Sequence, residues 1–167
     1  ISSYFLSYQK YLDGFGLLYA YNQRIEKESK QIGTNLKELY MSFFDSELAL
    51  AFVPFEGEKF DNCWFVATKS KSQSLAKQEL LEVINSFARN TGQTTSSFEK
   101  VFVVDRGKSV TIYRFPMAGL HETLFGNLFS LANDQYFTFI DSYVVFGNSV
   151  EALSRLILAN IHNKQLI

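Results

Sequence analysis

His121 and Glu122 are adjacent residues whose side chains could do acid-base chemistry together, because a carboxylate can orient and polarise an imidazole. They are neighbours in a segment that we expect to be helical from about Leu120. Adjacent helical residues point in different directions, so we expect both side chains at the surface rather than in a catalytic pair. The other histidine, His162, lies near the end of the last expected helix, where a helix dipole favours a positive imidazole.

Three further side chains could take part in nucleophilic or acid-base catalysis. Cys63 starts an apolar run beside Trp64 and has no evident basic neighbour to activate it, so we interpret it as a buried small hydrophobe. Asp45 and Glu47 are two residues apart, which would place them on one face of a strand that starts early. Such carboxylates more often flank the entrance of a strand. We therefore predict no catalytic residue.

The tripeptide Gly107-Lys108-Ser109 matches the end of a phosphate-binding loop. That loop needs a glycine five residues before its second glycine, and the position holds Phe102 within an expected strand, so we favour a hairpin turn. Asp105 opens this turn and Asp141-Ser142 separates two other strands; short polar side chains that bond to nearby backbone explain both. One cysteine and two distant histidines give no recognised zinc spacing, and no serine sits in a hydrolase elbow. We predict no metal and no cofactor.

The composition indicates an ordinary globular domain with a core rich in aromatic rings. Hydrophobic residues make up 47% of the 167 positions, with 17 Phe and 9 Tyr. The net charge of −1 comes from 16 basic and 17 acidic residues mixed along the chain, which argues against nucleic acid as a partner. The apolar segment Tyr4 to Tyr21 contains Gln9, Lys10 and Asp13, so we expect no membrane insertion within the chain.

We expect a helical lead-in over residues 1–44. Aromatic and aliphatic residues recur there every three or four positions, as on one face of a helix: Tyr4, Tyr8, Tyr11, Phe15 and Leu18. Gly14 and Gly16 could break this helix or let another backbone approach it, and the charged run Gln23 to Gln31 is its solvated continuation or a loop. Gly33 and Thr34 predict a helix end and a new N-cap. The helix that follows has an apolar side: Leu36, Leu39, Tyr40 and Phe43.

The body, residues 45–167, changes to the two-residue period of strands. We predict strands at 47–52, 63–67, 98–104, 109–115, 136–140 and 143–146, and helices from Ser72 or Ser74 to about 90, at 120–129, and after Asn148. Asn148 and Glu151 have the spacing of a capping box. Because most neighbouring strands are joined by hairpins, we predict a single α+β domain (1–167): an antiparallel sheet built from strand-strand-helix units, with helices mainly on one face, preceded by two N-terminal helices.

Three segments resemble the uncharacterised bacterial family called domain of unknown function 3352. They are QYFTFIDSYVVFGNSVEALSRLI (Gln135 to Ile157), LFGNLF (Leu124 to Phe129) and CWFVATKSKSQSLAKQEL (from Cys63). The resemblance covers about the C-terminal two-thirds of the chain. It implies a large envelope protein with a membrane anchor at its N-terminal end and α+β repeats that face away from the cytoplasm. It implies no activity and no site residue.

Two function classes remain. The first is a non-catalytic interaction or scaffold module of a bacterial envelope protein, with protein as the partner and an extracytoplasmic location, and it predicts a contiguous apolar surface patch. The second is a binding domain or enzyme for a small envelope ligand such as a peptide or glycan, and it predicts a deep pocket with converging polar groups. We favour the first because the second has no residues to nominate. We also expect the chain to be a piece of a longer polypeptide, since it begins at Ile1 inside a helical pattern.

Overall fold

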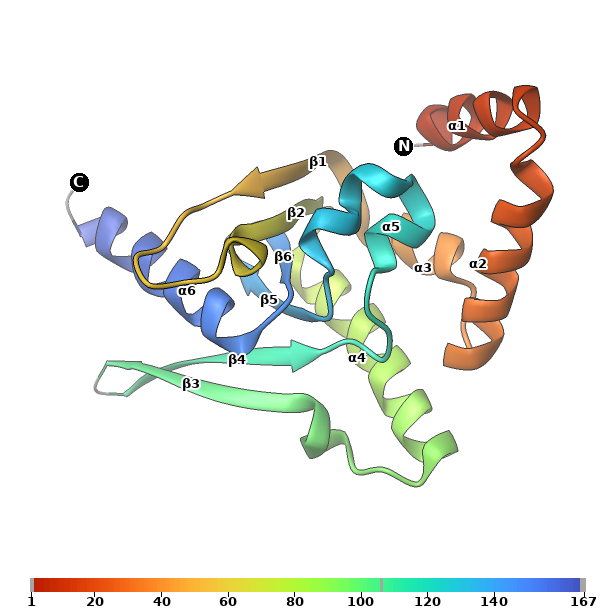
Figure 1. Cartoon of the computed structure of the whole chain (residues 1–167). Coiled ribbons are helices and arrows are strands. Elements are labelled where there is room, and N and C mark those ends of the chain that lie inside the picture. The colour runs from red at the N-terminus through yellow and green to blue at the C-terminus, as the bar shows by residue number, and fades with distance from the viewer. Residues whose placement is uncertain (1, 106, 166–167) are drawn as a thin grey trace.

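The computed structural model describes residues 2–105 and 107–165, and over this range it shows an α+β fold with a six-stranded antiparallel sheet, as predicted (Figure 1). The strands are β1 (Phe44–Phe52), β2 (Trp64–Ser70), β3 (Glu99–Asp105), β4 (Lys108–Arg114), β5 (Tyr136–Ile140) and β6 (Tyr143–Gly147). The α-helices are α1 (Ser2–Gly14), α2 (Leu18–Ile32), α3 (Leu36–Phe43), α4 (Gln73–Thr91), α5 (Leu120–Phe125) and α6 (Val150–Gln165). Short 3-10 segments form η1 (Phe60–Cys63), η2 (Thr95–Phe98) and η3 (Asn127–Ala132).

The strand order is β1-β2-β6-β5-β4-β3, so the three predicted hairpins lie side by side. The first and last hairpins meet where β2 pairs with β6, with Val66 opposite Phe146. The turn expected at Asp105 to Lys108 connects β3 to β4, and its Arg106 lies outside the described residues. No helix in the described ranges is both long and apolar enough to cross a membrane.

Helices pack on both faces of the sheet. Side chains alternate along β2, so that Val66 faces the larger core, which is formed with α3, α4 and α5. Phe65, its neighbour, faces a second core under α6. Leu153, Ile157 and Val145 are buried in this second core, whereas Leu50 on β1 is only half-buried in the first. The sheet therefore separates α6 from the other helices of the body.

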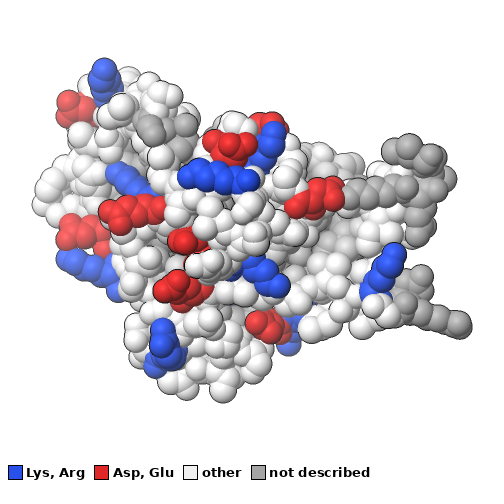
Figure 2. All heavy atoms as spheres, turned by 180° about the vertical axis from the view of Figure 1, so that it is seen from behind, with Lys and Arg blue, Asp and Glu red and all other residues white. Residues whose placement is uncertain are grey.

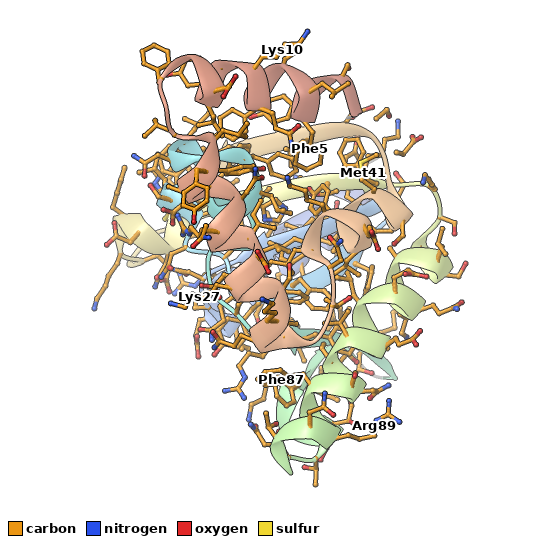
Figure 3. The ribbon with its side chains drawn as sticks, turned by 90° about the vertical axis from the view of Figure 1, so that its right-hand side faces the viewer. Phe5, Lys10, Lys27, Met41, Phe87 and Arg89 are labelled. Carbon is orange, nitrogen blue, oxygen red and sulfur yellow. The ribbon has the colours of Figure 1, made fainter. Side chains whose placement is uncertain are left out.

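The first expected helix is divided in two. Helix α1 ends at Gly14 and α2 begins at Leu18, and between them Gly16 takes a positive φ of 69°. The charged run expected as helix or loop is helical and belongs to α2. The buried side of α1 also differs from the predicted face, since Phe5 and Leu12 are its buried apolar residues. Figure 3 shows Phe5 directed from α1 toward the body and Lys10 directed away. The rings of Tyr4, Tyr8 and Tyr11 instead stack along the flank of α1, and the Phe15 ring is tilted against that of Tyr11.

Two predicted helix caps are wrong by one residue. The N-cap of α3 is Asn35, whose side chain accepts hydrogen bonds from two backbone N–H groups, rather than Thr34. At α6 the backbone N–H of Ala152 donates to the Ser149 hydroxyl, and Asn148 instead donates to the η1 segment, 3.0 Å from the Asp61 carbonyl oxygen. Both errors have one cause, because adjacent Thr, Asn and Ser residues all cap well and the sequence does not rank them. Of the two predicted candidates, Ser72 and Ser74, Ser72 is the N-cap of α4.

Candidate functional site

The larger core contains a chain of polar side chains whose groups could in principle do acid-base chemistry. His121 on α5 is hydrogen-bonded through Nδ1 to Oδ2 of Asp134, at 2.7 Å. Its Nε2 atom lies 3.1 Å from the hydroxyl of Tyr40 on α3, and that hydroxyl lies 2.6 Å from the Thr68 hydroxyl on β2. Two helices, a strand and the segment after η3 thus bring together a carboxylate, an imidazole and two hydroxyl groups.

The expectation that His121 lies at the surface is wrong. His121, Thr68 and Asp134 have 0% of their surface exposed, and Tyr40 has 1%. The sequence suggested Glu122 as the neighbour of this histidine, but Glu122 points outward and forms an ion pair with Arg24 on α2. The true partner, Asp134, is thirteen residues away. Local sequence spacing does not identify Asp134 as the partner, because Asp134 reaches His121 only after the chain passes through η3 and comes back to α5.

This polar chain has the groups of an acid-base site but no route for a substrate. Aromatic rings surround the imidazole, with the ring centroids of Tyr40, Phe125 and Phe146 4.7 to 6.0 Å away. Burial raises the pKa of Tyr40 well above its ordinary value, so its hydroxyl stays protonated and acts as a hydrogen-bonding group. Buried polar groups that form hydrogen bonds with one another favour a single packing arrangement. We therefore assign this set to the structure of the core.

The two carboxylates that the sequence suggested as an acid-base pair, Glu47 and Asp45, have different hydrogen-bond partners. Glu47 accepts hydrogen bonds from Lys69, at 2.8 Å, and from the Tyr143 hydroxyl, at 2.6 Å. These two hydrogen bonds, with that of Lys69 the larger effect, lower the pKa of Glu47. Asp45 accepts a hydrogen bond from the Ser46 hydroxyl at the surface. Glu47 and Asp45 do not form a carboxylate pair.

The remaining candidates have structural roles or lie apart. Cys63 is buried, as predicted, with its Sγ 3.5 Å from the Lys59 carbonyl oxygen. His162 is exposed on α6, and Gly107 makes a turn with a φ of 84°. Asp141 also occupies a turn, with a φ of 54°. Within the described part of the chain, no three His, Cys, Asp or Glu side chains come together in a way that could hold a metal ion.

A surface feature that sequence reasoning missed is an aromatic cluster where β1 ends. We define the aromatic cluster as Phe52, Phe60 and Trp64, with ring centroids 5.0 to 5.9 Å apart. Phe60 is 61% exposed and Phe52 is 43% exposed. Segment η1 contacts η3, and in Figure 1 the gold η1 turn lies beside the cyan η3 segment, which carries the exposed Leu128 and Leu131. The composition had suggested that rings belong in the core, and most phenylalanines do lie there.

On the face that Figure 2 shows, charged side chains of one sign do not gather into a patch. Figure 2 shows acidic and basic residues interleaved over the face behind that of Figure 1. A polar cavity of about 390 Å3 lies between α3 and α4, and its acidic lining residues, Glu38, Glu79 and Glu82, come with serine and asparagine side chains rather than with a base or a cation. This hollow offers no group that could be activated for catalysis by an opposite charge.

Comparisons of the chain with models of protein families, with curated proteins and with solved structures found no match. The resemblance to domain of unknown function 3352 therefore stays a prediction. What the protein does has to be argued from its own surface.

Proposed function

We propose that this protein is a non-catalytic interaction module of a bacterial envelope protein, and that it binds another protein through the aromatic cluster. The observation that carries this proposal is the exposure of Phe52 and Phe60 beside Trp64. Aromatic residues dominate the energetics of protein interfaces, because a ring buries a large apolar area while losing little conformational entropy. A group of three rings in mutual contact, two of them exposed to water, is therefore explained by a partner that covers it.

The surroundings of the cluster favour a protein over a glycan. A sugar-binding platform needs polar side chains next to the rings, because each hydroxyl of a buried sugar must keep a hydrogen bond. Segment η3, which contacts η1, carries two exposed leucines: Leu128, 66% exposed, and Leu131, 44% exposed. Aliphatic and aromatic side chains together form the apolar centre of a protein interface.

The enclosure of His121 supports the non-catalytic part of the proposal. A general acid or base must come within hydrogen-bond distance of its substrate, and the imidazole has no exposed surface. The bacterial and envelope parts of the proposal rest on the family resemblance alone. They predict that the partner is itself an envelope protein.

Site-specific crosslinking in cells that produce the protein tests this proposal. A photoreactive phenylalanine analogue at position 60 should give one discrete adduct with a protein of the envelope. The same analogue at Lys77, an exposed position on α4, is the control and should not give that adduct. With the partner purified, Phe60→Ser should weaken binding about tenfold or more, since a central ring is worth about 2 kcal/mol. Phe15→Ser, at an exposed ring of the N-terminal lead-in, should not change it. If the Phe60→Ser variant bound the partner as tightly as the Phe15→Ser variant, the proposal would be refuted.

A further inference from the structure

Strand β1 forms one edge of the sheet, and part of its outer side is unpaired. The strand order ends at β1, which lies along the upper margin of the sheet in Figure 1 and pairs with β2. The start of β1 is irregular, with a register shift between Phe44 and Leu48, whereas residues 48–52 pair regularly with β2. Within the described part of the chain, no backbone hydrogen bond joins residues 48–52 to any segment except β2.

The unpaired side presents the backbone groups of Leu48, Leu50 and Phe52. The N–H of Val53 donates to the Cys63 carbonyl oxygen at 2.8 Å, where the β1–β2 register continues. In an antiparallel pair, residues that bond to the partner strand alternate with residues whose N–H and C=O groups point to the other side. Every second residue back from Val53 therefore bonds to β2, and the three residues between them face the open edge. Such a row of unpaired groups is a template for another strand.

The regular stretch of β1 is apolar and ends at the aromatic cluster. Residues 48–53 have the sequence LALAFV, without a charged side chain, and Phe52 is the ring that β1 contributes to the cluster. On a strand added beside β1, the side chain opposite Phe52 lies on the same face of the sheet, next to the rings of Phe52 and Phe60. An added strand would therefore pair the free backbone groups and cover the rings together.

The charges that flank this stretch favour a segment of another protein over a second copy of the chain. Asp45, before the stretch, and Glu56, after it, form no ion pair among the described residues, whereas Glu47 and Glu58 have basic partners. If β1 paired antiparallel with itself about the middle of the stretch, Asp45 of one copy would lie beside Glu56 of the other, and like charges there are destabilising. The exposed Lys59 lies past the turn that contains Glu56. Basic side chains at the ends of a foreign segment are instead attracted to these carboxylates.

We infer that β1 accepts an extended segment of the partner as a seventh strand of the sheet, and that this segment is apolar in its middle and basic at its ends. The inference rests on the proposed function, because it names the form of the partner that covers the aromatic cluster. Backbone hydrogen bonds to Leu48, Leu50 and Phe52 hold the segment, and its side chain opposite Phe52 packs on the rings. The other edge strand, β3, carries Lys100, a residue type that discourages strand addition, and serves as the control edge.

Amide NMR with the synthetic peptide KVTFTVK tests this inference on the unmodified protein. The peptide should give saturable shifts, and at about nine-tenths occupancy it should slow hydrogen exchange of the Leu50 and Phe52 amides about tenfold, because only free protein exchanges. The Val101 amide, which faces the free side of β3 by the same alternation, should exchange as before. Absence of binding, or saturation that leaves the Leu50 and Phe52 amides unprotected, would overturn the inference.

Two further measurements test the choice of occupant. The charge-reversed peptide EVTFTVE should bind about threefold more weakly or worse, and equal affinity would overturn the basic ends. Protection of Leu50 and Phe52 that grows with protein concentration, without any peptide, would assign the edge to a second copy of the chain and would overturn the inference.

A matched pair of variants separates the backbone from the side chain. Leu50→Pro removes an outward N–H, while Leu50→Ala removes a similar apolar side chain and keeps that N–H. The proline variant should bind KVTFTVK about tenfold more weakly than the alanine variant. Equal affinities would overturn strand addition. If the proline variant does not fold, the amide measurement on the unmodified protein still decides.

The variant Phe60→Ser distinguishes failure of this inference from failure of the proposed function. If Phe60→Ser weakens peptide binding but the peptide never protects Leu50 and Phe52 in the unmodified protein, the rings bind without strand addition and this inference alone fails. If the peptide protects both amides and Phe60→Ser binds it as tightly as the unmodified protein does, strand addition is supported and the role of the aromatic cluster fails.

Discussion

The Nδ1 atom of His121 lies 2.7 Å from the Oδ2 atom of Asp134, although neither side chain has any surface exposed to solvent. This pair links α5 to the segment that leads into β5. The other carboxylate oxygen of Asp134 is also buried and has no hydrogen-bond partner among the described residues. A pair held in this way stabilises one arrangement of the core, because any other packing would leave both polar groups unpaired.

Removing the carboxylate should therefore destabilise the protein strongly. Asp134→Ala leaves the imidazole without its partner, and we expect a loss of about 2 to 4 kcal/mol in the free energy of unfolding, measured with denaturant. Asp134→Asn keeps an acceptor at nearly the same position and should lose less. A loss below about 0.5 kcal/mol for the alanine variant is within the range of ordinary surface substitutions and would show that the pair contributes little.

The second core should depend on Leu153, which is fully buried on the side of α6 that faces the sheet. Leu153→Ala should cost about 2 to 5 kcal/mol, through lost apolar burial and the cavity left behind. Leu128→Ala is the matched control, since this leucine is 66% exposed and should change stability by no more than about 0.5 kcal/mol. If both variants melt alike in denaturant, the inward face of α6 has been wrongly assigned.

A side chain at Gly126 should disturb the packing of α1. Its φ is 97°, and a Cβ added there would collide with the Tyr8 hydroxyl of α1. Gly92 also has a positive φ, of 68°, but open space around it, so Gly92→Ala measures backbone strain alone, about 1 kcal/mol. Gly126→Ala should cost more and should speed amide hydrogen exchange in α1. Unchanged exchange in α1 would mean that this close approach does not hold the helix.

The Glu47 carboxylate should titrate at an unusually low pH. Hydrogen bonds from Lys69 and, secondarily, from Tyr143 lower its pKa from the ordinary 4.5, although the group is at the surface. A carboxylate with a depressed folded-state pKa contributes stability above its ordinary pKa, and this contribution is lost as the pH falls through the folded value. An NMR titration of the carboxyl carbon should show the low midpoint. Lys69→Ala should raise it further than Tyr143→Phe does, and a midpoint insensitive to both would contradict the geometry.

Much of the fold could be predicted because local signals agreed. Alternation along Leu48 and Leu50 marked β1, the cap at Ser72 marked the start of α4, and short turns between strands implied an antiparallel sheet. The site residues could not be predicted in the same way. Burial of His121 depends on Asp134 and Tyr40, which reach it from other parts of the chain. Helical periodicity reports which residues share a face, but not which face meets the core.

The aromatic cluster escaped prediction for a related reason. Phe52 continues the apolar alternation of β1, and that pattern is typical of burial. Phe52 is nevertheless 43% exposed, and it lies at the end of a strand at the edge of the sheet. The sequence pattern alone therefore does not distinguish this exposed ring from a buried one. The distinction requires the sheet topology, which places β1 at the edge and η1 beside it.

The most direct test of the proposed interaction is oxidative footprinting of Phe60 with hydroxyl radicals. In the purified protein this ring should be oxidised readily, as its 61% exposure requires. In cells that produce the protein it should be protected by the partner, while the exposed Tyr19 on α2 reports that radicals reach the molecule. Protection of Phe60 confined to cells is the result that the account predicts. Equal oxidation of Phe60 in both settings, with Tyr19 labelled in each, would contradict it.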